Sequence, residues 1–137
     1  MSLLLDTDVL IDLALDREPF AEPAAALFEI LERRPGFAWI AWHTASNFYY
    51  LVAPERGPSG ARRFLAELTE FVRIAETTTE SLRTATGLAL RDFEDAMQVA
   101  AALACGAELI VTRNLKDYRA SPVPAISPER AVARLAD

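Results

Sequence analysis

The chain has 137 residues, of which 52% are hydrophobic and 25% are charged, and its formal net charge at pH 7 is −6. This length is about one domain and is sufficient to bury a substantial core. The negative charge argues against a protein that grips nucleic acid through a broad basic face, because such binding depends on many phosphate contacts, but it leaves a local binding site open. No apolar run approaches the roughly 20 residues that a bilayer requires, so no membrane association is expected.

The N-terminus lacks a basic segment followed by a long apolar stretch, so no secretory signal is visible and a cytoplasmic protein is expected. The single cysteine, Cys105, excludes an internal disulfide. No repeat or long linker divides the sequence. We therefore expect residues 1–137 to form a single domain.

Short apolar runs alternate with longer helical stretches along the chain. The runs that read as buried strands are residues 3–5, 37–41 and 109–111, with weaker candidates at 72–75 and 123–127. The predicted helices cover residues 8–15, 22–34, 44–52, 59–71, 79–89, 92–105 and 128–135. Strands separated by helices predict a three-layer α/β/α sandwich with a central parallel sheet of four or five strands.

The first predicted strand ends at an acidic residue. Asp6 directly follows Leu3-Leu4-Leu5, so its carboxylate is expected at the carboxyl end of a buried strand, where open parallel sheets bind ligands. Asp8, two residues later, is interpreted as the N-cap of the next helix. Asp12, within that helix, is interpreted as a solvated residue.

Three acids crowd the start of the predicted helix 92–105, in the stretch "RDFEDAMQVAAALACG". Asp92 is expected to cap this helix, and Glu94 and Asp95 lie in the first turn, where the helix dipole favours negative charge. On a period of 3.6, Asp95 shares a face with Val99, which directs its carboxylate toward the sheet. Arg91 precedes the helix or lies at its edge, so a metal ion or bound water is the favoured partner of Asp95.

A third group of polar residues follows the predicted strand 109–111 in the stretch "ELIVTRNLKDY". Thr112, Asn114 and Asp117 come directly after this strand. An asparagine in a loop after a strand is by itself a turn signal. Convergence with Asp6 and Asp95 on one rim of the sheet is a more specific pattern, and it predicts a metal site made of oxygen ligands.

Oxygen ligands select hard cations, Mg²⁺ or Mn²⁺, rather than zinc. The single His43 and the single Cys105 cannot build a zinc site alone, and His43 is interpreted as a capping or surface residue. Two carboxylates about 5 Å apart repel by about 3 kcal/mol at an effective dielectric constant of 20, so a cation is favoured between them. Such a site polarises a phosphodiester and activates water.

Three stretches of the chain together carry a family resemblance. They are "LLDTDVLIDL" at 4–13, the long stretch from "RDFEDAMQV" to "TRNLKDY" at 91–118, and "SPVPAISPE" at 121–129. They resemble the PIN domain family, and in particular its VapC-like toxin ribonuclease branch. The resemblance implies an α/β/α fold, a Mg²⁺ or Mn²⁺ site of clustered acids, cleavage of RNA, a small antitoxin protein as partner, and a homodimer.

The resemblance also assigns roles to particular positions. The metal ligands implied are Asp6, Asp95, Asn114 and Asp117; the catalytic residues are Asp6, Asp95, the supporting acid Asp92, and Asn47; and the residues that position the substrate are Thr7, Thr112 and Arg113. The predicted function is that of a divalent-metal-dependent ribonuclease that hydrolyses RNA phosphodiester bonds as the toxin of a type II toxin–antitoxin pair.

Two positions depart from the family pattern. Many relatives carry a glutamate where "WHTASNFYYLV" offers Asn47, and an aspartate where this chain has Asn114. An amide can bind a metal through its oxygen, but it adds no charge and cannot act as a base. The alternative function is therefore a PIN-like module that binds RNA or an antitoxin with weak or no catalysis.

A second alternative comes from another class of enzyme. The order "DTDVL" places Asp6 and Asp8 where a phosphohydrolase of the haloacid dehalogenase type has its nucleophile and its acid. That class also needs a downstream lysine in the site. The only lysine is Lys116, and 137 residues leave little room for a cap domain, so the sequence favours the nuclease.

Overall fold

A five-stranded sheet forms the centre of the computed structural model, which describes residues 1–136. All neighbouring strands are parallel, in the order β3-β2-β1-β4-β5. The strands are β1 (Leu3–Leu5), β2 (Ala38–Ile40), β3 (Val72–Ile74), β4 (Leu109–Val111) and β5 (Ala125–Ile126). The predicted parallel sheet is confirmed, and the two weaker candidates are its edge strands.

Helices connect the strands and cover both faces of the sheet. They are α1 (Thr7–Ala14), α2 (Ala21–Arg33), α3 (Trp42–Arg56), α4 (Pro58–Leu68), α5 (Thr79–Gly87), α6 (Phe93–Cys105) and α7 (Pro128–Leu135), with a short 3₁₀ helix, η1 (Leu115–Tyr118). Helix α3 is longer than the predicted 44–52, since it continues past Pro54 until Gly57, at φ 83°, ends it. No helix within residues 1–136 is long and apolar enough to cross a bilayer.

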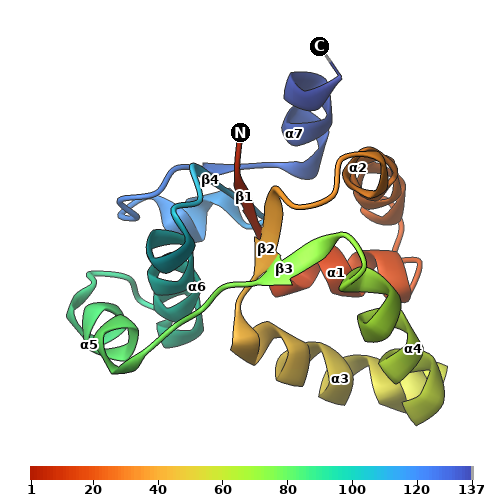
Figure 1. Cartoon of the computed structure of the whole chain (residues 1–137), viewed down its shortest axis with the longest axis horizontal. Coiled ribbons are helices and arrows are strands. Elements are labelled where there is room, and N and C mark those ends of the chain that lie inside the picture. Colours follow the sequence, from red (N-terminus) through yellow and green to blue (C-terminus); the bar gives the residue numbers. More distant parts are fainter. Residues whose placement is uncertain (137) are drawn as a thin grey trace.

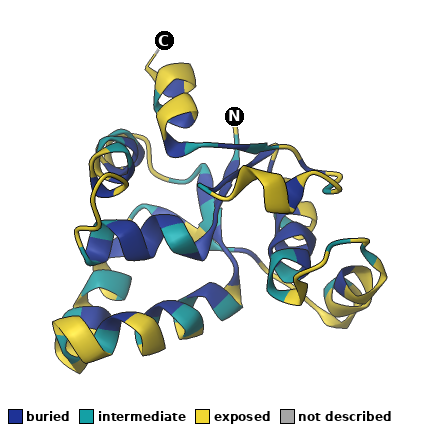
Figure 2. Cartoon of the chain, turned by 180° about the vertical axis from the view of Figure 1, so that it is seen from behind, coloured by how far each residue is buried: buried dark blue, intermediate teal, exposed yellow. Residues whose placement is uncertain are grey.

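The helices form two unequal layers around the sheet. Helices α5 and α6 lie on one side, and α1 to α4 lie on the other, with α7 beside α2 (Figure 1). Along β1, Leu3 and Leu5 pack into the core of the larger layer, whereas Leu4 packs with Val99 of α6. All three leucines are fully buried, as the dark central strands of Figure 2 show. A strand covered on both faces reads as a continuous apolar run, which is why "LLL" predicted it correctly.

The strand order creates a switch point between β1 and β4. From this pair the sheet extends in one direction through β2 and β3 and in the other through β5. Ligands of open parallel sheets bind outside the carboxyl ends of the strands at such a point. Leu5 pairs with Val111 across the two strands, so the residues that follow, Asp6 and Thr112, emerge side by side. The fold thus brings together two of the predicted site residues.

Candidate active site

Asp6 connects β1 to α1. Its backbone is extended, with φ −70° and ψ 152°, and its Oδ1 accepts a hydrogen bond from the backbone N–H of Thr7 at 2.7 Å. Asp6 is therefore the N-cap of α1, and the interpretation of Asp8 as the cap was wrong, because Asp8 lies one residue inside the first turn. The cap places a carboxylate that is only 5% exposed at the edge of the sheet.

Neutral donors surround the Asp6 carboxylate. Its Oδ2 accepts from the hydroxyls of Thr112 at 2.9 Å and Tyr118 at 3.0 Å, and its Oδ1 accepts from the Gln98 amide at 3.2 Å. Within residues 1–136, no lysine, arginine or histidine forms an ion pair with it. Burial, and next the charge of Glu94, raise the pKa of Asp6. Neutral groups donate hydrogen bonds to both oxygens of this carboxylate, but no positively charged side chain within residues 1–136 pairs with it.

Asp8 extends the site toward the loop after β4. Its Oδ2 accepts from Asn114 Nδ2 at 3.0 Å and lies 3.2 Å from the Thr112 hydroxyl oxygen. Its Oδ1 is buried and has no hydrogen-bond partner within residues 1–136. Burial, together with the nearby charge of Asp6, raises the pKa of Asp8 to about 7. A buried oxygen without a partner on an ionisable group is unusual, and a bound water or ion would satisfy it.

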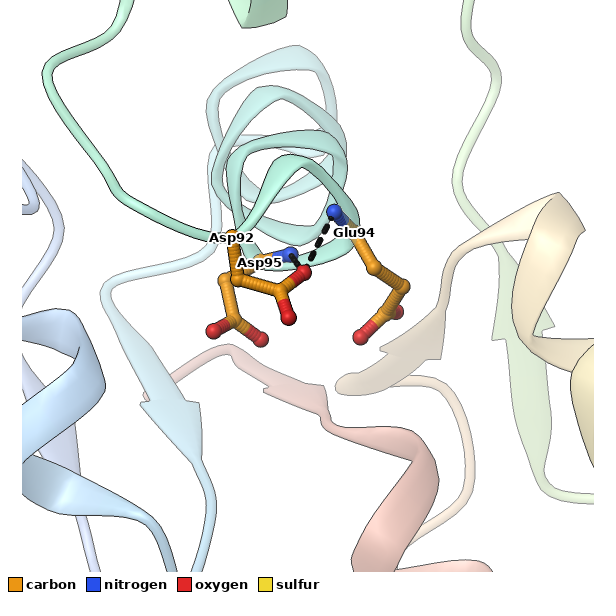
Figure 3. A group of neighbouring side chains, drawn as sticks. All are labelled: Asp92, Glu94 and Asp95. Carbon is orange, nitrogen blue, oxygen red and sulfur yellow. Dashed lines mark hydrogen bonds between the residues drawn. The ribbon is translucent and has the colours of Figure 1, made fainter.

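The first turn of α6 contributes three further acids. Asp92 is the predicted N-cap and accepts from the backbone N–H groups of Glu94 at 2.8 Å and Asp95 at 3.3 Å. The three side chains offer carboxylate oxygens that lie within 4.8 Å of one another, below the end of α6 and facing the end of β1 (Figure 3). The Tyr118 hydroxyl contacts Asp95 Oδ1 at 3.2 Å as well as Asp6. Burial, and then the charge of Asp6, raise the pKa of Asp95 to about 7.

Gln98 links the acids of α6 to the end of β1. It is fully buried, and its Nε2 lies 2.9 Å from Glu94 Oε2 and 3.0 Å from the Thr44 hydroxyl, in addition to its contact with Asp6. His43 Nε2 lies 2.7 Å from the same Glu94 oxygen. The interpretation of His43 as a capping or surface residue was wrong, since its side chain is 19% exposed and contacts the site.

Several residues of this network were missed by reasoning from the sequence. Glu94 was assigned only to the helix dipole, and Gln98, Thr44 and Tyr118 were not singled out. One local signal was present for Gln98. It follows Glu94 by four positions, on the same face of a helix whose other inward residues are apolar.

Two predicted residues are not joined to the network by side-chain hydrogen bonds within residues 1–136. Asn47 is half-buried on α3, three positions after Thr44. Asp117 is exposed in η1 and lines the same groove as Asp92 and Asp95. Their proposed contacts with a metal remain predictions.

Arg113 forms an ion pair with Asp12, an acid outside the predicted site. Its guanidinium donates to Asp12 Oδ2 at 2.7 Å and to Oδ1 at 3.3 Å, and it lies over the ring of Phe20, 4.3 Å from the centroid. The hydrogen bond to Asp12 is the main reason why the pKa of Arg113 is raised. Asp12 is 2% exposed, so its interpretation as a solvated residue was wrong. Thr7, also expected to position substrate, is buried and donates its hydroxyl to Thr44 at 3.1 Å.

The set of donors fits a divalent cation of the hard class. Carboxylates from the ends of two elements converge, Asp6 after β1 and the Asp92, Glu94 and Asp95 cluster on α6, with Tyr118 bridging Asp6 and Asp95. The nearby orphaned oxygen of Asp8 adds a further oxygen donor. Uncompensated negative charge and oxygen-only ligands favour Mg²⁺ or Mn²⁺.

Solved structures with the same architecture come from several bacteria. A chain of VapBC2 from Rickettsia felis, bound to a DNA fragment from its promoter, aligns with a TM-score of 0.71 and 15% identity, covering 93% of this chain and 98% of that one. A chain of a toxin–antitoxin complex from Klebsiella pneumoniae aligns at 0.70 with 24% identity and the same coverage. VapC20 of Mycobacterium tuberculosis, a sarcin–ricin loop cleaving toxin, aligns at 0.64 with 18% identity, covering 80% and 87% of the two chains.

The sequence itself identifies the family. No curated protein gives a significant match. The sequence pattern described as the PIN domain matches residues 2–116, a span that includes β1 to β4 and the acids Asp6, Asp8, Asp92, Glu94 and Asp95. This chain belongs to the PIN domain family.

Proposed function

We propose that this protein is a divalent-metal-dependent ribonuclease of the VapC-like branch, and that it is the toxin of a type II toxin–antitoxin pair. One observation carries the proposal. Asp6 and Asp95, from distant parts of the chain, share the hydroxyl of Tyr118 at the switch point of the sheet. No cation of the protein pairs with either acid within residues 1–136.

Residues of this chain would bind the cation directly. Asp6 and Asp95, supported by Asp92 and Glu94, are the proposed ligands, and the Tyr118 hydroxyl orients the first two. A bound Mg²⁺ or Mn²⁺ would polarise a phosphodiester, lower the pKa of bound water and offset charge on the leaving oxygen. Without it, carboxylates this close together repel one another and the substrate phosphate.

The structural neighbours support RNA as the substrate and an antitoxin protein as the partner. VapC20 is described as a toxin that cleaves the sarcin–ricin loop, and the Klebsiella structure is a toxin–antitoxin complex. A shared fold does not by itself determine function, so the proposed reaction class rests on the acids of the site. An acidic rim is also complementary to an arginine or lysine of an inhibitory partner, which would replace the cation's charge and block phosphate entry.

A homodimer is proposed from the surface of α3. Three large apolar side chains on this helix are exposed: Trp42 at 72%, Tyr50 at 73% and Leu51 at 56%. Large apolar side chains left exposed to solvent are available for a protein–protein contact. Light scattering of the purified protein tests this, and a monomer at all concentrations would contradict it.

Cleavage of RNA by isosteric variants tests the proposed site. Asp6→Asn and Asp95→Asn should each lower Mn²⁺-dependent cleavage by at least about 100-fold, because each removes a ligand charge while keeping the shape of the side chain. Asp6→Asn also keeps the cap of α1, since asparagine caps helices as well as aspartate does. Asp16→Asn is the matched control, because Asp16 is exposed and outside the site.

The outcomes separate the nuclease from a binding module. Loss of cleavage in both site variants, with full activity in the Asp16 control, supports the ribonuclease. A wild-type protein that binds RNA but cleaves none with Mg²⁺ or Mn²⁺ favours the binding module. Cleavage that persists unchanged in either site variant rules out this assignment of the site.

Co-expression tests the antitoxin. The product of a short neighbouring gene should form a stable complex with this chain and suppress its cleavage of RNA. A complex that retains full nuclease activity would contradict the blocking mechanism.

A further inference from the structure

A groove beside the acids combines both signs of charge. Its volume is about 390 Å³, and its lining includes the three acids Asp92, Asp95 and Asp117. Arg91, Lys116 and Arg119 line the same groove. The cations come from two segments that lie far apart in the sequence, the loop before α6 and the region of η1. The tertiary fold thus gathers three positive charges next to the candidate cation site of a protein whose net charge is −6.

These three cations are not used to neutralise the acids. The ion pairs formed within residues 1–136 involve other basic residues, namely His43, Arg83 and Arg113. All three groove cations are exposed, and none donates a side-chain hydrogen bond within the described chain. Arg91, the one cation near Asp95 in sequence, therefore leaves that carboxylate unpaired. The groove presents free cationic groups to an anion from solution.

We propose that Arg91, Lys116 and Arg119 bind the backbone phosphates of RNA next to the bond that is cut. This inference rests on the proposed ribonuclease function. A phosphodiester approaching Asp92 and Asp95 meets like charge, and cations lining the same groove supply the attraction that brings it in. Arginine forks suit phosphate recognition, and contacts to phosphate position a strand without reading its sequence.

Binding of RNA tests the groove separately from cleavage. The probe is a fluorescent single-stranded oligoribonucleotide of mixed sequence, and the protein carries Asp6→Asn to prevent cutting. Adding Arg91→Gln, Lys116→Gln and Arg119→Gln should weaken binding by at least about tenfold. It should also reduce the slope of log affinity against log salt, by about 0.7 for each phosphate that the groove no longer binds.

A matched control removes the same charge elsewhere. Arg62→Gln, Arg63→Gln and Arg134→Gln change three exposed arginines on α4 and α7, so the net charge becomes equally negative. This variant should bind the probe within about threefold of its parent, because distant exposed charges are screened. In the cleaving background, the groove variant should raise KM far more than it lowers kcat, whereas the control should leave both close to wild type.

The possible results of these binding and cleavage measurements lead to different conclusions about the proposal. Equal RNA affinity of the groove variant and the control overturns the proposal, even if the wild type cleaves RNA. A groove variant that binds RNA normally but no longer binds the antitoxin also overturns it. Selective loss of RNA binding in the groove variant supports the groove as the phosphate-binding site, and a wild type that binds in this way but fails to cleave would overturn the ribonuclease function and the placement next to a cut bond.

Discussion

Asp8 and Asp12 lie one turn apart on α1, and they differ in whether an ion pair balances their negative charge. Asp12 is paired with the Arg113 guanidinium through two hydrogen bonds, at 2.7 and 3.3 Å. Asp8 accepts from the Asn114 amide and the Arg113 backbone N–H through one oxygen, its other oxygen has no hydrogen-bond partner within residues 1–136, and it forms no ion pair there. The same helix thus carries one acid that forms an ion pair and one that does not.

The difference distinguishes Asp12, whose ion pair stabilises the fold, from the acids of the candidate site, whose negative charge is free to bind a cation. A buried charge is tolerated when an opposite charge and hydrogen bonds compensate it, as Arg113 does for Asp12. Asp6 accepts hydrogen bonds from Tyr118 and Gln98, and the Tyr118 hydroxyl also lies 3.2 Å from Asp95, but these neutral groups do not cancel the negative charge. Burial then raises the pKa of each of these acids.

Replacing the paired acid should have the largest effect on stability. Asp12→Asn should lower the free energy of unfolding by about 3 kcal/mol, the low end for breaking a buried ion pair, because the Arg113 side chain is 29% exposed. Asp8→Asn removes a buried charge that has no ion-pair partner within residues 1–136 and should leave stability unchanged or increased. Urea unfolding without divalent cations measures both, and equal destabilisation by the two variants would contradict the comparison.

Removing the neutral donor between two site acids should have the next largest effect. Gln98→Met keeps a similar volume but leaves Asp6 and Glu94 facing each other, so the unfolding free energy should fall by about 2 kcal/mol. Added Mn²⁺ should restore part of this loss. Thr44→Val is the control, because its hydroxyl contacts Gln98 and Thr7 but no carboxylate. Its smaller loss should not respond to Mn²⁺, and a Gln98→Met loss that is equally unresponsive would argue against a cation between the acids.

Adding a carboxylate should increase the affinity of the site for a divalent cation. Asn47→Glu restores the charge found in many relatives and should tighten Mn²⁺ binding by about tenfold, ~1.4 kcal/mol, since ligand charge tunes affinity for hard cations. Ser46→Glu adds the same charge at the exposed neighbouring position and should change the affinity much less. Titration calorimetry compares them, and equal affinity of Asn47→Glu and wild type would show that this position does not face the cation.

The smallest expected effect is a pH dependence of stability in the metal-free protein. Asp8 and Asp95 have pKa values of about 7, raised from the ordinary 3.8. The folded state therefore holds protons that the unfolded state releases, so their contribution to stability is fully present below about pH 4 and is lost as the pH rises through about 7. The melting temperature should fall by a few degrees between about pH 5 and about pH 8, since solvent screening reduces the effect.

Two changes should reduce that pH dependence. Saturating Mn²⁺ offsets the ionised carboxylates at the higher pH, and Asp8→Asn removes one of the groups that titrate. Thermal denaturation followed by circular dichroism measures each case. A metal-free protein whose melting temperature rises over this range would show that the site acids are compensated within the protein.

Much of the architecture was predictable because it depends on local patterns. The continuous apolar runs at Leu3–Leu5 and Leu109–Val111 predicted two central strands with correct bounds, since strands buried on both faces need apolar side chains throughout. The cap at Asp92 was predicted correctly as well, because its partners are two and three residues away. The cap at α1 was misplaced by two residues, since Asp6 and Asp8 are both good capping residues and only the observed hydrogen bond distinguishes them.

By itself the sequence determined the layers, the strand end that carries Asp6, the helix start that carries Asp95, and the family, because each follows from residues close together in the chain. Only the tertiary structure decided which charges are compensated. Arg113 reaches Asp12 across 101 residues of sequence, and the Tyr118 hydroxyl reaches Asp6 across 112. A hydrogen bond requires atoms placed within a few tenths of an ångström, and residue periodicity carries no information at that scale between distant elements.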